Sequence, residues 1–172
     1  MLRNTLAVLA LSVSVGLAQA QAPANLDPQN TLALDTKDGR VTIRLRPDLA
    51  PKHVEQIKAL TKRGFYDGIV FHRVIDGFMA QTCCPHGTGT GGSKYPDLKA
   101  EFNAEPHVRG TASMARAQNP NSANSQFFIC FDDARFLDRQ YTVWGKVAEG
   151  MENVDGIKRG ERVGCENRAE VS

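Results

Sequence analysis

The stretch from Phe71 to Gln81 constrains the fold most, because it predicts two strands joined by a tight turn. Apolar and polar residues alternate up to Asp76-Gly77, a dipeptide typical of turns, and the apolar pattern then resumes. Alternation predicts that Phe71 and Arg73 share one face of the first strand. An arginine among apolar side chains costs several kcal/mol unless its donors find partners, so we expect Arg73 to be kept for a function.

The first 20 residues are expected to be a removable export signal. Arg3 supplies a positive start, Leu6 to Leu17 an apolar stretch, and Ala18-Gln19-Ala20 a small-residue cleavage site. The apolar stretch is too short to span a bilayer comfortably, and no cysteine at the cleavage point offers a lipid anchor. We expect a flexible lead-in at 21–29, a single domain at 30–172, and a periplasmic or secreted location after cleavage near Ala20.

The charge pattern excludes some classes of partner. The formal net charge is +2, and lysines and arginines are scattered among acidic residues rather than clustered. We therefore expect no nucleic-acid partner and no membrane association once the signal is removed.

The remaining pattern is dominated by strands. A hairpin with an Asp-Gly turn is predicted over 31–45, and further strands over 110–115, 125–131, 142–147 and near Val163. A helix is expected to open at Pro51 and stop at Gly64, and Met151, Val154 and Ile157 mark a short second helix. Two helices so far apart do not fit a βαβ alternation, so the pattern indicates a β-rich domain.

Eight ordered segments together resemble the cyclophilin family of peptidyl-prolyl cis-trans isomerases. They are Phe65-Tyr66-Asp67-Gly68, Phe71 to Gln81, Gly87 to Gly92, Ala100-Glu101-Phe102, Arg109 to Ala115, Ser125 to Cys130, Phe136-Leu137-Asp138 and Thr142 to Val147. The resemblance implies a mainly β fold, namely a closed eight-stranded antiparallel barrel capped at both ends by an α-helix. It also implies an enzyme that rotates Xaa-Pro bonds and assists folding, without cofactor or metal. The predicted signal suggests exported proteins as its substrates, and the pattern shows no obvious exposed apolar helix, which is compatible with a monomer.

The chemistry explains why such an enzyme needs an arginine. Rotation of a prolyl bond crosses a barrier of about 18–20 kcal/mol set by amide resonance, and no covalent bond breaks. At the twisted transition state the proline nitrogen regains a lone pair, and a guanidinium beside it would favour that state. The resemblance implies that Arg73 has this role, with Gln81 bracing the guanidinium or binding the substrate backbone and His72 in support. The implied substrate-binding residues are Phe78, Met79, Ala115, the backbone of Arg116, Gln126, Phe128, Phe136, Leu137 and Tyr141.

The sequence departs from the family in several places. Phe136 stands where the family commonly has tryptophan, so the indole N–H donor is missing and only weak binding of cyclosporin-like cyclic peptides is expected. Tyr141 replaces a histidine and Arg116 a frequent asparagine. Cys83-Cys84 follows Gln81 where glycines are usual; a positive φ at Cys83 would cost roughly 1–2 kcal/mol.

Two other functions stay open at this stage. A binding module or chaperone could hold proline-containing segments in the same groove without turnover. Alternatively, Cys83, Cys84 and His86 could serve as a thiol or soft-metal site, although their spacing fits no standard zinc pattern. An exported chain with four cysteines permits a disulfide, whereas Cys130, inside an apolar strand, is expected to be a buried free thiol.

Overall fold

The computed structural model describes residues 26–167, and it gives side-chain surroundings as far as Gly164. The predicted signal at 1–20 and most of the lead-in lie outside this range. The strands are β1 (Thr31–Thr36), β2 (Gly39–Leu45), β3 (Arg73–Ile75), β4 (Met79–Thr82), β5 (Thr111–Met114), β6 (Phe127–Cys130), β7 (Val143–Glu149) and β8 (Gly164–Asn167). The helices are α1 (Pro51–Lys62), α2 (Met151–Asp155) and the short 3-10 helices η1 (Pro28–Asn30) and η2 (Arg135–Leu137). None of the described helices is long and apolar enough to cross a membrane.

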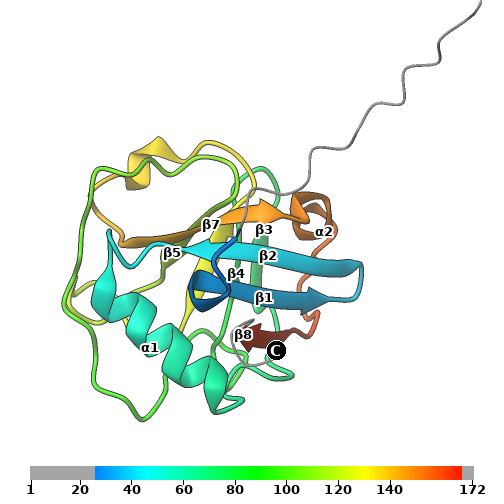
Figure 1. Cartoon of the computed structure of the whole chain (residues 1–172), viewed down its shortest axis with the longest axis horizontal. Coiled ribbons are helices and arrows are strands. Elements are labelled where there is room, and N and C mark those ends of the chain that lie inside the picture. Colours follow the sequence, from blue (N-terminus) through cyan, green and yellow to red (C-terminus); the bar gives the residue numbers. More distant parts are fainter. Residues whose placement is uncertain (1–25, 168–172) are drawn as a thin grey trace, which may run out of the picture.

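All eight strands form one antiparallel sheet in the order β3-β4-β6-β5-β7-β2-β1-β8. Figure 1 shows the sheet curving around the interior, with α1 and α2 on different sides of it. The prediction of a mainly β, antiparallel domain with two helices is therefore confirmed.

The prediction of a closed barrel is not confirmed, because β3 and β8 are edge strands that share no ladder within residues 26–167. The segments just before these two strands meet instead. Backbone N–H groups of Gly68 and Phe71 donate to the carbonyls of Val163 and Glu161, and Gly160 N–H donates back to the Phe71 carbonyl at 2.8 Å. We call these paired segments, 68–71 and 160–163, the seam.

Local sequence signals define α1 as predicted. Pro51 occupies its first turn, and Val54, Ile57 and Leu60 are buried against the sheet. At the other end Gly64 adopts a φ of 65°, and its N–H and that of Phe65 satisfy the carbonyls of Thr61 and Leu60. This pair of bonds is a Schellman motif, which needs a left-handed residue that glycine provides without strain.

The first predicted hairpin is present, with a small shift of its turn. Thr36 pairs with Gly39, so the two-residue connection is Lys37-Asp38 and Gly39 already belongs to β2. The prediction for the stretch around Arg73 needs a larger correction. Phe71 is fully buried whereas Arg73 is exposed, although alternation predicted one shared face. The reason is that β3 begins only at Arg73. The residues before it, 68–71, pair with 160–163 rather than with β4.

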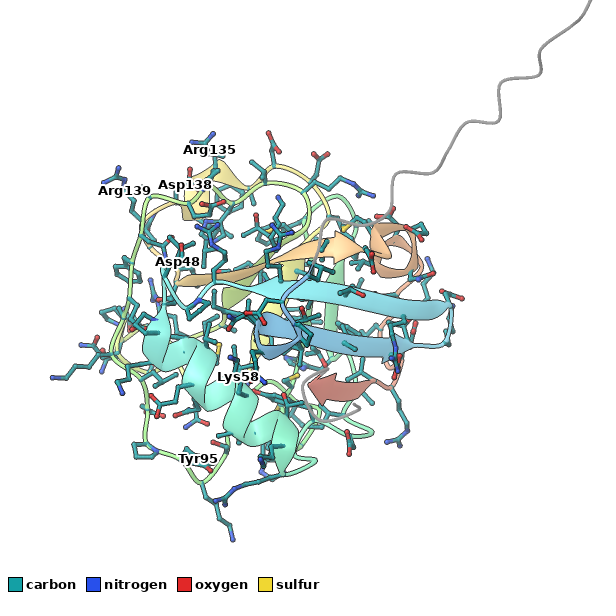
Figure 2. All side chains as sticks on the ribbon, viewed as in Figure 1. Asp48, Lys58, Tyr95, Arg135, Asp138 and Arg139 are labelled. Carbon is teal, nitrogen blue, oxygen red and sulfur yellow. The ribbon has the colours of Figure 1, made fainter. Side chains whose placement is uncertain are left out.

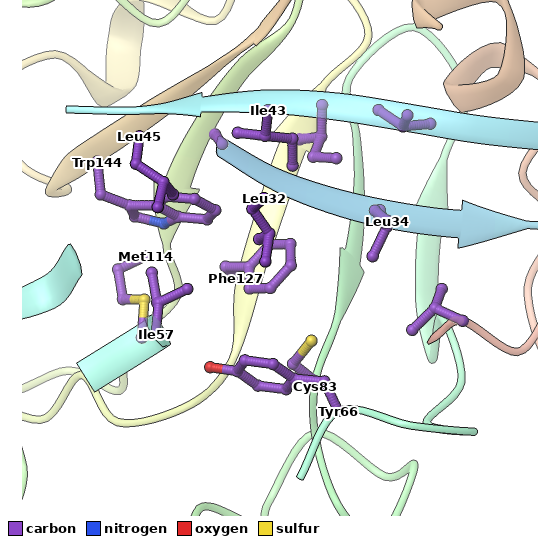
Figure 3. Close-up of a cluster of buried hydrophobic side chains, with 14 of the residues drawn as sticks. Leu32, Leu34, Ile43, Leu45, Ile57, Tyr66, Cys83, Met114, Phe127 and Trp144 are labelled. Atoms are coloured by element: carbon purple, nitrogen blue, oxygen red, sulfur yellow. The ribbon is translucent and has the colours of Figure 1, made fainter. Parts of the chain in front are cut away.

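The interior is divided into two clusters by the alternation of β6. Phe127 and Ile129 point into the main core, whereas Phe128 and Cys130 point to the other side, into a smaller cluster with Met79, Ala134 and Leu137. Figure 3 shows the main core, where Phe127 lies between Trp144 and Tyr66. Its ring makes edge-to-face contacts with both, at centroid distances of 5.1 and 6.0 Å.

The backbone conformation at Gly150 can be tested by substitution. It has a φ of 80°, and a β-carbon there would lie 2.3 Å from the Arg40 carbonyl oxygen. We expect Gly150→Ala to lower the free energy of unfolding by about 3 kcal/mol, because strain and a backbone clash add. Gly160→Ala is the matched control, since its φ is 88° with nothing within 4 Å, and it should cost only about 1 kcal/mol. Equal losses in urea unfolding would contradict this account.

Candidate active site

A small apolar pocket of about 90 Å³ lies over the smaller cluster. Met79 and Phe128, both buried, belong to β4 and β6 in that cluster, and Leu137 reaches it from η2. The complete lining is Arg73, Phe78, Met79, Gln81, Ala115, Arg116, Phe128, Leu137 and Tyr141. The lining thus combines apolar side chains with the polar groups of Arg73, Gln81 and Arg116.

Strand register brings the key residues into one row across the sheet. Arg73 of β3 pairs with Gln81 of β4, and Gln81 pairs with Phe128 of β6. Paired residues on adjacent strands project to the same face, so the guanidinium, the amide and the aromatic ring lie next to one another. The buried face of this region is fixed by the main core, so a one-residue slip would exchange pocket and core residues.

A chain of hydrogen bonds holds the Arg73 side of the pocket. Arg73 Nη1 donates to Gln81 Oε1 at 3.4 Å, and Gln81 Nε2 donates to Gln126 Oε1 at 3.0 Å. Gln126 Nε2 in turn donates to the carbonyls of Gly89 and Gly91 at 2.9 and 2.7 Å. Because carbonyls only accept, they orient Gln126, which orients Gln81 so that its oxygen faces the guanidinium. Gln126 itself lines the adjoining polar cavity of about 380 Å³ rather than the apolar pocket.

Arg116 and Tyr141 also line the pocket. The Arg116 guanidinium lies 4.6 Å from the centre of the Tyr141 ring, a cation–π contact. It also donates to the carbonyls of Gln140, Ala117 and Gln118. The side chain thus ties two loops together, a role that sequence reasoning, which used only its backbone, did not foresee.

Comparison with known proteins identifies this combination of fold and pocket. Residues 31–171 match the family model of the cyclophilin-type peptidyl-prolyl cis-trans isomerase/CLD domain. The chain belongs to this family. It is a cyclophilin-type peptidyl-prolyl cis-trans isomerase, as its sequence predicted.

Relatives and solved structures agree with this assignment. A probable peptidyl-prolyl cis-trans isomerase of Brucella suis is 57% identical over 171 residues, covering 92% of this chain and 86% of that protein. A peptidyl-prolyl cis-trans isomerase of Synechococcus elongatus is 42% identical over 132 residues, covering 76% and 90%. The crystal structure of a Hirschia baltica cyclophilin superposes with a TM-score of 0.77 at 28% identity, covering 86% of this chain and 77% of that one. A Cryptosporidium parvum cyclophilin crystallised in the presence of the dipeptide Ala-Pro gives 0.70 at 29% identity, covering 77% and 90%.

Most residues predicted for the site of this cyclophilin are brought together, but three stand apart. His72 is buried and lines a neighbouring groove instead of the apolar pocket. Burial is the largest effect on its ring and lowers its pKa, although the Val70 backbone and the Gln126 side chain act in the opposite direction. Phe136 is 66% exposed at the rim, with its ring 5.4 Å from that of Phe78. The third residue, Gln126, lines the polar cavity and contacts the pocket only through its hydrogen bond with Gln81.

Sequence reasoning missed His107, which lies behind the pocket. Its ring stacks on Phe128 at 6.2 Å, Nε2 lies 2.9 Å from Ser113 Oγ, and Nδ1 lies 3.2 Å from Asp138 Oδ1. Burial opposes ionisation of Asp138, but the His107 backbone N–H and Arg135 outweigh it and lower the pKa of that carboxyl to about 2. Figure 2 shows Arg135 and Asp138 together at one edge of the molecule. No local motif marks a histidine whose partners lie in β5, in β6 and just after η2.

The cysteines give a mixed outcome. Cys83 has a φ of 70°, so the positive φ considered for this position is present and costs about 1–2 kcal/mol. Cys130 is a buried free thiol as predicted, and burial raises its pKa to about 12. Among the described residues no group of three or more His, Cys, Asp or Glu side chains is placed to hold a metal. The side chain of Cys165 lies outside the described part, so a disulfide to it stays untested.

Cys84 lies in a ring of backbone donors. Its Sγ accepts from the N–H groups of Gly89 and Gly91 at 3.2 and 3.3 Å. Burial acts to raise its pKa, but the N–H groups of Gly91, His86, Thr88 and Gly89 favour the thiolate and lower the pKa to about 7 from 9.0.

We expect the lowered pKa of Cys84 to affect how the stability of the protein depends on pH. A depressed pKa stabilises the folded chain fully above pH 9.0, and this contribution disappears as the pH falls through about 7. The free energy of unfolding of the wild type, minus that of Cys84→Ala, should therefore rise between pH 7 and 9 in denaturant titrations.

Cys130→Ala is the control for this measurement. The raised pKa of Cys130 predicts no rise in this interval and a loss of stability above pH 9.0. A flat difference for Cys84→Ala would show that its thiol is not ionised in the folded protein.

Proposed function

We propose that this isomerase acts on proline-containing segments of exported proteins, and that the Arg73 guanidinium supplies its rate enhancement. The observation that carries the proposal is the position of Arg73 at the border of an apolar pocket, held by Gln81. The Cryptosporidium relative crystallised with Ala-Pro supports a proline-containing ligand for such a pocket. The predicted signal at 1–20 supports action in the periplasm or outside the cell.

The pocket and the arginine have different tasks in this mechanism. Met79, Phe128 and Leu137 hold the proline ring by apolar contact, which fixes the prolyl side of the bond while the preceding residue rotates. Such binding acts on the planar and twisted forms alike and alone gives affinity without rate. The arginine adds selectivity for the twisted form, because only there can the proline nitrogen accept a hydrogen bond.

The orientation of the Arg73 guanidinium determines how strongly it stabilises the twisted form of the prolyl bond. Arg73 is exposed, so water competes for its donors and its conformational freedom is costly to restrict. The chain through Gln81 and Gln126 to two glycine carbonyls offsets this by fixing one amino group of the guanidinium on Gln81. The other donors remain for the substrate. Gln81 and Gln126 are therefore positioning residues.

We expect Arg73→Ala to lower kcat/KM about a hundredfold for an Ala-Pro peptide, since loss of one transition-state donor typically costs this much. Cis-trans exchange measured by NMR provides the rates, and circular dichroism checks the fold. Arg44→Ala is the control, because Arg44 is equally exposed on β2 and lines none of the three cavities around the site. A wild type that binds the peptide without accelerating exchange would favour the binding-module function.

Phe136→Trp is expected to tighten binding of a cyclosporin-like cyclic peptide up to about tenfold, the value of one added hydrogen bond. The exposed position of Phe136 leaves room for an indole whose N–H faces solvent and ligand. Isothermal titration gives the affinities. Phe136→Leu, which adds no donor, should not tighten binding; equal tightening by both changes would rule out the N–H as the cause.

A further inference from the structure

A second, wider depression of about 600 Å³ adjoins the apolar pocket and shares Arg73, Gln81 and Arg116 with it. Its third cation is Arg159, which lies in the connection that leads from α2 to the seam. We call it the arginine groove, after Arg73, Arg116 and Arg159. No carboxylate lines it. Three guanidinium groups around one open cavity produce a local positive potential, although the whole chain carries only +2.

None of the three arginines has an acidic partner among the described residues. Four other arginines are neutralised locally, in the pairs Arg40–Asp35, Arg46–Asp48, Arg109–Asp155 and Arg135–Asp138. Arg63 and Arg162, by contrast, contact a tyrosine ring and a carbonyl. Within the described part of the chain, Arg73 and Arg116 contact only neutral oxygens, and Arg159 makes no ion pair. What distinguishes the groove is that its three guanidinium groups line one cavity without a carboxylate among its lining residues.

The other walls of the groove favour an anion as well. The hydroxyl groups of Thr88 and Thr90 lie 2.8 Å apart and hydrogen-bond each other, which leaves one hydroxyl proton that can donate to a carboxylate. His72 is buried and its pKa is lowered, so the charge comes from the arginines alone. The adjoining polar cavity differs, because Arg116 is the one arginine in its lining and Asp97 lines it as well. The positive potential therefore belongs to one side of the proline pocket.

We propose that the arginine groove selects substrate segments that carry an acidic side chain close to the proline. This inference rests on the proposed function, because the groove acts on a peptide whose proline occupies the apolar pocket. Arg73 would then serve both processes, whereas Arg159 would serve only selection. An ion pair at an exposed site is weak, so the effect is a preference and not a requirement.

The test is a set of short peptides around one Ala-Pro core, with Glu, Gln or Lys at the position before alanine or at the first or second position after proline. We expect Glu to exceed Gln in kcat/KM about two- to fivefold at one position at least, the range of an exposed ion pair. Lys should fall below Gln at that same position. The Glu-to-Gln ratio should decline toward one in about 1 M salt, where the screening length is about 3 Å.

Two variants locate the effect. Arg159→Gln should reduce the Glu-to-Gln ratio, and Arg159→Glu should reduce it further and favour Lys. Arg44→Gln removes the same charge outside the groove and should leave the ratio unchanged. Equal rates for Glu, Gln and Lys at every position, or a ratio that Arg44→Gln lowers as much as Arg159→Gln, would overturn the inference. Failure of the isomerase function itself would look different, because then even the Gln peptides would exchange at the uncatalysed rate.

Discussion

The strict alternation of β6 is the constraint on which the site depends. One set of its side chains fills the main core, so the opposite set must face the pocket, with Phe128 at its floor. Since Phe128 pairs with Gln81 and Gln81 with Arg73, the burial of Phe127 and Ile129 indirectly fixes the place of Arg73. Stability and catalysis here use opposite faces of the same strands.

The sequence predicted correctly those elements whose form depends on residues close together in the chain. Pro51 and Gly64 predicted both ends of α1, and the hairpin of β1 and β2 followed from its turn and alternation. The resemblance to a family supplied most of the pocket, because motifs such as Phe71 to Gln81 keep their spacing. The strands of the sheet were therefore largely predictable.

Features that depend on contacts distant in sequence could not be predicted in this way. Arg73 was expected among apolar side chains, yet it is exposed, because pairing of the preceding residues with 160–163 interrupts the alternation. The positive φ of Cys83 depends on the path of the chain after β4, which composition does not reveal. His107 and the Arg116 side chain find partners in segments that no local pattern connects.

The seam has a consequence for the order in which the site can be completed. All residues that line the apolar pocket lie between Arg73 and Tyr141, whereas the arginine groove also needs Arg159, next to the bond from Gly160 to Phe71. A chain emerging from its N-terminus thus contains the whole pocket before it contains the groove. If the groove selects substrates as proposed, this selection is the last property to be encoded along the chain, in the connection between α2 and the seam.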